Sequence, residues 1–268
     1  MSALPLPILV AGAGNLGGAL ITGWLRAGAI DPPQLMVRDP NPSPAALSAQ
    51  AAGAALNPDD GALLGARTVI LAVKPQIWRV VAADLAPRLG SESTIVSVVA
   101  GVNARDLGEA FGGRAVVRAM PTTAAAICQG ATTLWSADLA LRGRIATLFA
   151  PLGAVVTLED EALIHVATAA SGSGPAYLYA FIEALEAAAA GQGLEPADAR
   201  NLVRATVTGA AALLAQSGED PAELRRKVTS PKGVTEAALA VLMGPGGFED
   251  LLNAALAKAV ARSRELGT

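Results

Sequence analysis

Three glycines near the start of the chain have the spacing of a phosphate-binding turn. They stand in Gly12-Ala-Gly14-Asn-Leu-Gly17, after the apolar run 8–11 and before a helix-permissive stretch. The first glycine permits a tight turn, the second lets backbone approach a pyrophosphate, and the third allows close packing of helix on strand. The pyrophosphate would lie on the helix N-terminus, where free N–H groups and the helix dipole favour anions. This context predicts a dinucleotide site with contacts from Gly12, Gly14, Asn15, Leu16 and Gly17.

Two charged residues, Arg38 and Asp39, stand at the tip of the next predicted strand. Asp39 follows Gly17 by about 20 residues, where an acidic side chain hydrogen-bonds the ribose 2′-hydroxyl of NADH. Arg38 could instead pair with the 2′-phosphate of NADPH, and an exposed turn without function is the alternative for both. Because the two residues give opposite indications, the choice between NADPH and NADH stays open.

A second polar group, Ser230-Pro-Lys-Gly233-Val-Thr235, precedes an apolar helical segment. Backbone N–H groups at the start of that helix would bind a carboxylate, and the Thr235 hydroxyl could reach the ring of a substrate held there. An ordinary Ser/Thr cap followed by a Pro-Gly turn is the alternative, and spacing alone favours it.

The first half of the chain alternates short β-branched runs with helix-permissive stretches, which is typical of a parallel α/β sheet. We expect strands at 8–11, 35–37, 69–73, 94–99, 115–117, 131–135 and 154–158, with helices at 19–26, 45–52, 77–85 and 139–149. Beyond residue 159 Ala and Leu dominate, and we expect only helices, at 161–170, 177–190, 197–215, 221–227, 234–243 and 251–265. The fold prediction is therefore an α/β Rossmann domain with a mostly parallel sheet over 1–158, followed by an all-α domain over 159–268.

Composition excludes several classes of protein. The chain has 268 residues and a net charge of −3, without a cluster of Lys or Arg, which argues against a nucleic-acid surface. No apolar run reaches the roughly 18 residues of a membrane span, and the start has no basic segment typical of a signal peptide. A single cysteine fits a reducing compartment. We expect a cytoplasmic protein with no membrane or nucleic-acid partner and no metal site.

Six segments, in order along nearly the whole chain, resemble the pyrroline-5-carboxylate reductase family. They are residues 12–17, Ala72-Val-Lys-Pro75, Ser97-Val-Val-Ala-Gly101, Arg118-Ala-Met-Pro121, Ser171-Gly-Ser-Gly-Pro175-Ala-Tyr177 and Val228-Thr-Ser-Pro-Lys-Gly-Val-Thr235. The resemblance implies a Rossmann domain and a helical domain that interlocks into a homodimer, with dimers assembled into rings in some members. It also implies reduction of a small cyclic imine, 1-pyrroline-5-carboxylate, to L-proline with NADPH or NADH, the last step of proline biosynthesis.

The same resemblance implies roles for individual residues. Thr235 would be catalytic by hydrogen-bonding the imine nitrogen, while Ser230 and the backbone of Gly233, Val234 and Thr235 would hold the substrate carboxylate. Further coenzyme contacts would come from Ala72, Val73, Lys74, Pro75, Ala100, Gly101 and Met120. A protonated imine is already electrophilic, so orientation supplies most of the rate, which suits a chain with one histidine.

The sequence departs from the family pattern in two places. Thr122-Thr123-Ala124 replaces the usual Asn-Thr-Pro, and Lys232 replaces the first glycine of Ser-Pro-Gly-Gly-x-Thr. Both departures put affinity and coenzyme preference in doubt. Two other functions remain open: another imine or 3-hydroxyacid-type dehydrogenase of similar layout, or a non-catalytic nucleotide-binding relative. The stretch 171–183 lacks the helical lysine that 3-hydroxyacid dehydrogenases use, which counts against the first.

Overall fold

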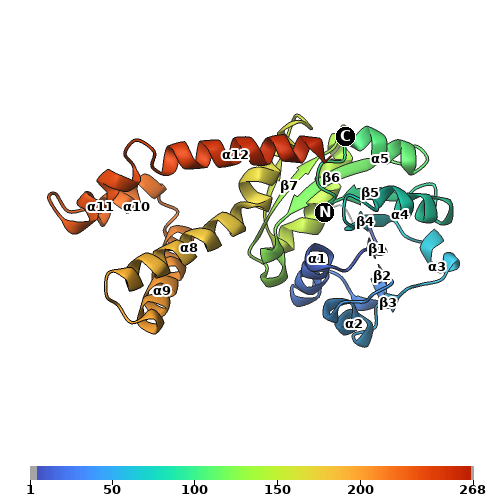
Figure 1. The fold of residues 1–268 in the computed structure, drawn as a ribbon. Helices are drawn as coiled ribbons and strands as arrows, with labels where there is room; N and C mark the ends of the chain where they lie inside the picture. Colours follow the sequence, from blue (N-terminus) through green and yellow to red (C-terminus); the bar gives the residue numbers. More distant parts are fainter. Residues whose placement is uncertain (1–4, 267–268) are drawn as a thin grey trace. The chain divides into compact units, whose positions relative to one another are not determined.

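The computed structural model describes residues 5–266, and its first part is built on an eight-stranded sheet (Figure 1). The strand order is β3-β2-β1-β4-β5-β6-β7-β8, with every neighbouring pair parallel except β6 and β7. The strands are β1 (Ile8–Ala11), β2 (Leu35–Arg38), β3 (Ala55–Leu56), β4 (Thr68–Leu71), β5 (Thr94–Ser97), β6 (Val116–Pro121), β7 (Gly130–Trp135) and β8 (Gly153–Thr157). The prediction of a mostly parallel sheet is confirmed.

The central strands β1, β4 and β5 are buried along their whole length, because helices cover both faces of the sheet. These helices are α1 (Asn15–Arg26), α2 (Pro44–Ala51), α3 (Asp60–Leu64), α4 (Trp78–Leu85), α5 (Ala104–Ala110) and α6 (Leu139–Phe149). Trp24 of α1 anchors one face: its indole N–H donates to the Leu148 carbonyl at 2.8 Å, and its ring meets Phe149 edge-on at 5.9 Å.

Some boundaries differ from those predicted. The strands expected over 69–73 and 94–99 end at Leu71 and Ser97, since the chain turns out of the sheet there to form loops. The helix expected at 19–26 begins at Asn15, directly after the glycine turn. The short elements β3, α3 and α5 were not expected, because none of them has enough residues to show a periodic pattern.

The chain divides into two compact units, of which the first extends to Gly172 and takes in the chain again from Ala259. The second unit is Ser173–Lys258. These units differ from the predicted division at 158/159, because α7 (Leu163–Ala167) and the π-turn Thr168–Gly172 pack with the sheet. The functional division into a dinucleotide-binding domain and a dimerisation domain stays a prediction.

The second unit is entirely helical among its regular elements, as expected for this part of the chain. It contains α8 (Gly174–Gly191), α9 (Pro196–Ser217), α10 (Pro221–Lys227), α11 (Val234–Leu242) and the first part of α12 (Phe248–Glu265). Pro175 lies in the first turn of α8, where its missing N–H costs nothing. Phe181 of α8 contacts Phe248 of α12 edge-on at 6.1 Å. Within residues 5–266 no helix combines the length and apolarity needed to cross a membrane.

Candidate functional site

The turn that joins β1 to α1 requires two of its three glycines for steric reasons. Gly12 has a φ of +95°, and a Cβ there would lie 2.6 Å from the Ala72 carbonyl oxygen. A Cβ on Gly17 would lie 2.0 Å from the Gly12 carbonyl oxygen. Since β1 and β4 are neighbours and α1 packs directly on the turn, side chains at these positions would push the turn out of place.

Gly14, in contrast, faces open space. A Cβ placed on it meets no atom within 4 Å, and Gly14 is the N-cap of α1 with no side chain hydrogen-bonded to the free N–H groups. Unpaired N–H groups and the positive end of the helix dipole favour an anion at this point. The geometry therefore fits the pyrophosphate of a dinucleotide.

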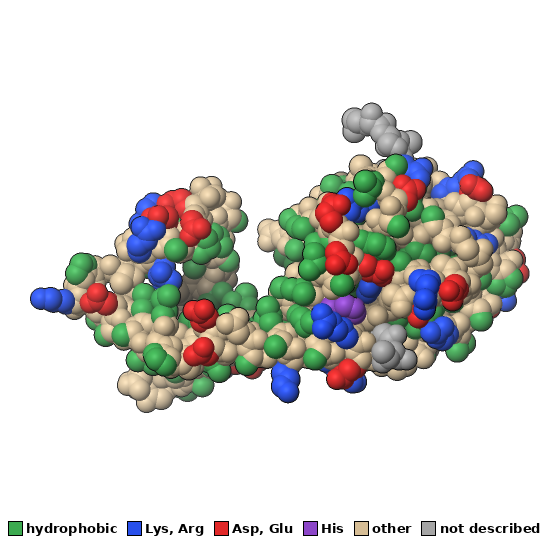
Figure 2. Space-filling model, turned by 90° about the horizontal axis from the view of Figure 1, so that it is seen from above, with side chains coloured by type: hydrophobic (Ala, Val, Ile, Leu, Met, Phe, Trp, Pro, Cys, Tyr) green, Lys and Arg blue, Asp and Glu red, His purple; other side chains and the backbone are tan. Residues whose placement is uncertain are grey.

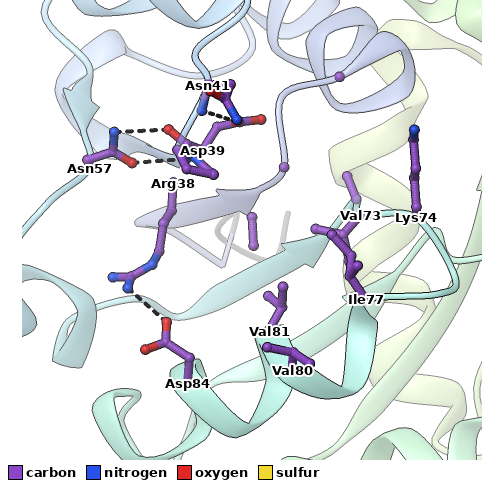
Figure 3. Close-up of a pocket in the computed structure, with 15 residues that line it drawn as sticks. Arg38, Asp39, Asn41, Asn57, Val73, Lys74, Ile77, Val80, Val81 and Asp84 are labelled. Atoms are coloured by element: carbon purple, nitrogen blue, oxygen red, sulfur yellow. Dashed lines mark hydrogen bonds and ion pairs between the residues drawn. The ribbon is translucent and has the colours of Figure 1, made fainter.

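The open space belongs to a cavity of about 810 Å³ in the first unit, of the size that holds a small-molecule cofactor (Figure 3). Seven of the predicted coenzyme residues line it: Gly12, Gly14, Arg38, Asp39, Ala72, Val73 and Lys74. The loop after β4 supplies the last three, because the carboxyl ends of parallel strands meet at one edge of the sheet.

One face of α4 forms an apolar wall of this cavity. Ile77, just before the helix, and Val80 are 48% and 73% exposed, and both line the cavity together with Val81. Their spacing puts them on one side, whereas Trp78, Ala82 and Leu85 face the core. These cavity residues were not predicted from the sequence. The signal for them was an apolar face on α4 in addition to the face that packs in the core.

The opposite end of the cavity is polar and surrounds Asp39. The Asp39 carboxylate accepts from the backbone N–H of Ala13 at 2.7 Å and of Asn41 at 2.8 Å. Asn57 holds the Asp39 backbone from both sides: its Oδ1 accepts from the Asp39 N–H at 2.9 Å, and its Nδ2 donates to the Asp39 carbonyl at 3.0 Å. Asn57 was not predicted; its φ of +48° is a conformation that asparagine tolerates better than most residues.

Seven predicted coenzyme residues do not line the cavity. Asn15, Leu16 and Gly17 open α1 beneath the turn, and Pro75 follows Lys74 in the loop after β4. Ala100 and Gly101 lie beyond β5, and Met120 lies in β6, all toward the same carboxyl edge of the sheet. Met120 is buried and packs beside Gly172, where an added Cβ would make an ordinary contact with the Met120 sulfur at 3.5 Å.

The second unit holds the predicted substrate residues. Gly233 is the N-cap of α11, which begins at Val234, and the Gly233 N–H donates to the Ser230 carbonyl at 3.0 Å. Thr235 is exposed in the first turn and is not the cap, so the alternative of an ordinary Ser/Thr cap is wrong. Lys232 has a φ of +57°, and its N–H donates to a Glu236 carboxylate oxygen at 2.6 Å.

Two family models match separate parts of the chain. The family model described as pyrroline-5-carboxylate reductase dimerisation matches residues 161–266, and that described as NADP oxidoreductase, coenzyme F420-dependent, matches residues 7–101. A pyrroline-5-carboxylate reductase of Pseudomonas aeruginosa is 40% identical over 261 residues, which cover 95% of this chain and 94% of that protein.

Two solved structures are similar along almost their whole length. The structure of a pyrroline-5-carboxylate reductase from Coxiella burnetii has a TM-score of 0.88 at 31% identity and covers 98% of this chain and 99% of its own. That of a Plasmodium falciparum pyrroline carboxylate reductase with NADP bound has a TM-score of 0.84 at 25% identity, covering 99% of this chain and 100% of its own.

Proposed function

Because the chain belongs to the pyrroline-5-carboxylate reductase family, we propose that the cavity beside Gly14 holds its coenzyme and that Thr235 contacts its substrate. The enzyme reduces 1-pyrroline-5-carboxylate to L-proline with NAD(P)H. The individual residues that carry out this reaction, and the assembly in which they do so, are the subject of the proposal.

The open space over Gly14 is the observation that carries the coenzyme assignment. It lies at an uncapped helix N-terminus, between the apolar side of α4 and the carboxylate of Asp39. The diphosphate would lie on the N–H groups of Asn15 and Leu16, and the adenosine between Ile77, Val80 and the tip of β2. The nicotinamide, when bound, supplies the hydride that reduces the imine carbon.

The N-terminus of α11 supports the substrate assignment. Its cap is a glycine without a side chain, and the Thr235 hydroxyl is not used as a cap, so both are open to a ligand. The backbone N–H groups of Val234 and Thr235, with Ser230, would bind the carboxylate, and Gly233, whose own N–H bonds Ser230, would leave room for it. The Thr235 hydroxyl would orient the ring by a hydrogen bond at its nitrogen, which needs no ionisable side chain.

Replacement of Thr235 tests this role. If its hydroxyl bonds the ring nitrogen, Thr235→Ala should lower kcat about ten- to a hundred-fold, because a hydrogen bond to a charged group is worth about 1.5–3 kcal/mol. Thr235→Ser should keep most of the activity, and Tm should hardly change because Gly233 is the cap. Thr147→Ala, an exposed threonine of α6, is the matched control and should behave as wild type. Wild-type kcat in Thr235→Ala would refute the assignment.

We also propose that the enzyme is a homodimer held together through its second unit. Assembly of such dimers into a ring would be a further step of the same proposal. The match of residues 161–266 to a dimerisation model supports the dimer. A cytoplasmic location fits the single, unpaired Cys128 and is part of the same proposal.

A further inference from the structure

We propose that Asp84, acting together with Asp39, makes this reductase prefer NADH to NADPH. The inference rests on the proposed coenzyme cavity and concerns its polar end, where the two coenzymes differ by one phosphate on the adenosine ribose. Three features of the polar end of the cavity carry it: a carboxylate held in place at the tip of β2, an arginine that is already paired, and the second carboxylate, Asp84, with which that arginine pairs.

The Asp39 carboxylate is held ready to accept hydrogen bonds from ribose hydroxyls. Its two oxygens each accept one backbone N–H, from Ala13 and from Asn41. Each oxygen of an ionised carboxylate has a further lone pair, so both can accept one more bond. A 2′-hydroxyl would donate to this group, whereas a 2′-phosphate has only acceptor oxygens and negative charge to offer it.

Arg38 is the residue that would have to offset this repulsion, but it points elsewhere. Its guanidinium extends toward α4, where Nη2 lies 2.8 Å from the Asp84 carboxylate (Figure 3). Side chains of consecutive residues leave an extended chain on opposite sides, so Arg38 and Asp39 diverge at the tip of β2. Lys74, the other Lys or Arg among the described residues lining the cavity, lies on the loop after β4.

The Arg38–Asp84 pair belongs to a chain of charges that continues beyond the cavity. Asp84 also lies 3.0 Å from Arg88, which lies 2.7 Å from Asp60. Of these residues only Arg38 and Asp84 line the cavity, so at its polar end two carboxylates, Asp39 and Asp84, face one arginine. The side chains of Arg38 and Asp84 are 28% and 40% exposed, so their bond is weak enough for Arg38 to leave it. If Arg38 turned away from Asp84 to meet a phosphate, the Asp84 carboxylate would be left unpaired there. The summed charge of Arg38, Asp39 and Asp84 would still be negative.

The test uses the full-length protein and measures the Kd of NADH and of NADPH by titration calorimetry, with kcat/KM as a second readout. Wild type should bind NADH about tenfold more tightly than NADPH at low salt, since both carboxylates act against the phosphate. Asp84→Asn removes one carboxylate and releases Arg38, so the ratio of the two Kd values should shift toward NADPH by about three- to tenfold. Adding Arg38→Leu to Asp84→Asn should abolish that shift.

Asp60→Asn is the matched control, because Asp60 contacts Arg88 but does not line the cavity and should leave the Kd ratio unchanged. A wild-type protein that binds NADPH as tightly as NADH, or a ratio unmoved by Asp84→Asn, would overturn the inference. Failure of the cavity assignment itself has a different signature: Gly14→Val would then leave both Kd values unchanged.

Discussion

At the scale of single residues, the three glycines of the turn after β1 have separate tasks. Gly12 and Gly17 lie against backbone atoms, so a side chain at either position would disturb the fold. A methyl group on Gly14 would meet no atom within 4 Å, so a side chain there would project into the proposed coenzyme cavity and leave the fold intact. Binding and folding can therefore be separated at this one position.

We expect Gly14→Val to lose coenzyme binding at least a hundred-fold while unfolding almost like wild type. The loss of stability should be at most about 1 kcal/mol, the usual cost of a poor N-cap residue. Calorimetric titration with NADH and a urea unfolding curve on the same sample check both halves. Gly143→Val on α6, where a Cβ also meets nothing, is the control and should bind normally. Wild-type affinity in Gly14→Val would contradict the cavity assignment.

Lys232 carries a local strain that the family pattern avoids with glycine. Its φ of +57° lies in the left-handed region, which costs a residue with a side chain roughly 1–2 kcal/mol. Its N–H bond to Glu236 keeps the turn in place all the same. The structure thus explains why glycine is usual at this position, while the retained lysine charge has no explanation in the described contacts.

Lys232→Gly should raise the free energy of unfolding by about 0.5–1 kcal/mol, since relief of strain exceeds the added chain entropy of glycine. Urea unfolding at a fixed protein concentration measures this change. Lys258→Gly is the contrasting control: it lies inside α12, where glycine should lower stability by about 1 kcal/mol. An equal loss in both variants would show that the backbone at Lys232 is not strained.

At the scale of elements, a small polar network fastens α7 and the end of α12 to the sheet. Arg118 of β6, nearly inaccessible to solvent, donates to Glu161 at 3.1 Å, and Glu161 also accepts the Ala104 N–H at the start of α5. His165 Nδ1 lies 2.9 Å from the Ser263 hydroxyl of α12. Burial lowers the pKa of His165, Arg118 and Arg264 lower it further, and Glu161 opposes them weakly.

Because of His165, the free energy of unfolding should decrease in mild acid. Because the folded-state pKa of His165 is below its unfolded value of 6.5, the unfolded chain binds more protons near pH 6. The contribution of neutral His165 to the free energy of unfolding is therefore fully present above pH 6.5. It is lost as the pH falls through the lower pKa that His165 has in the folded protein. We expect the urea midpoint to drop more between pH 7.5 and pH 5.5 in wild type than in His165→Gln. As the chain has one histidine, equal drops would refute the linkage.

At the scale of the whole molecule, the second unit has a very small core: its buried residues are Ala199 and Val203 of α9. Helices α8, α10 and α11 contain no buried residue, and large apolar side chains such as Tyr179 and Val241 are 61% and 75% exposed. Figure 2 shows hydrophobic side chains open on the surface of this helical region. An apolar surface of this kind on a single chain is typical of a protein–protein interface.

Light scattering should therefore find at least twice the mass of one chain at assay concentrations, and no active monomer. Leu202 and Leu213 are exposed on one side of α9, about three turns apart. The double variant Leu202→Glu/Leu213→Glu should dissociate the assembly and abolish activity. Leu139→Glu, an equally exposed leucine of the first unit, is the control and should leave the mass unchanged. A stable and active monomer would rule out the dimer.

Local patterns in the sequence were sufficient for the fold class and for the glycine turn at the centre of the proposed coenzyme site. Apolar strands such as 8–11 and the glycine spacing that follows encode short-range geometry, so β1, the turn and α1 could be predicted together. Motifs along the chain were also sufficient for the family, because six of them occur in order. The sequence showed that Lys232 departs from the family pattern. The structure added the reason why glycine is usual there, because the backbone has a positive φ at this position.

Tertiary structure alone decided which distant side chains share the proposed coenzyme cavity. Asn57 and Asp84 are far from Asp39 and Arg38 along the chain, and no local pattern marks them as partners. They meet because β3 and α4 pack beside β2 and β4, and the direction of Arg38 depends on a carboxylate that only this packing supplies. Hydrogen bonds and ion pairs act over a few ångströms of space irrespective of sequence separation, so coenzyme preference was open in the sequence and became testable only with the fold.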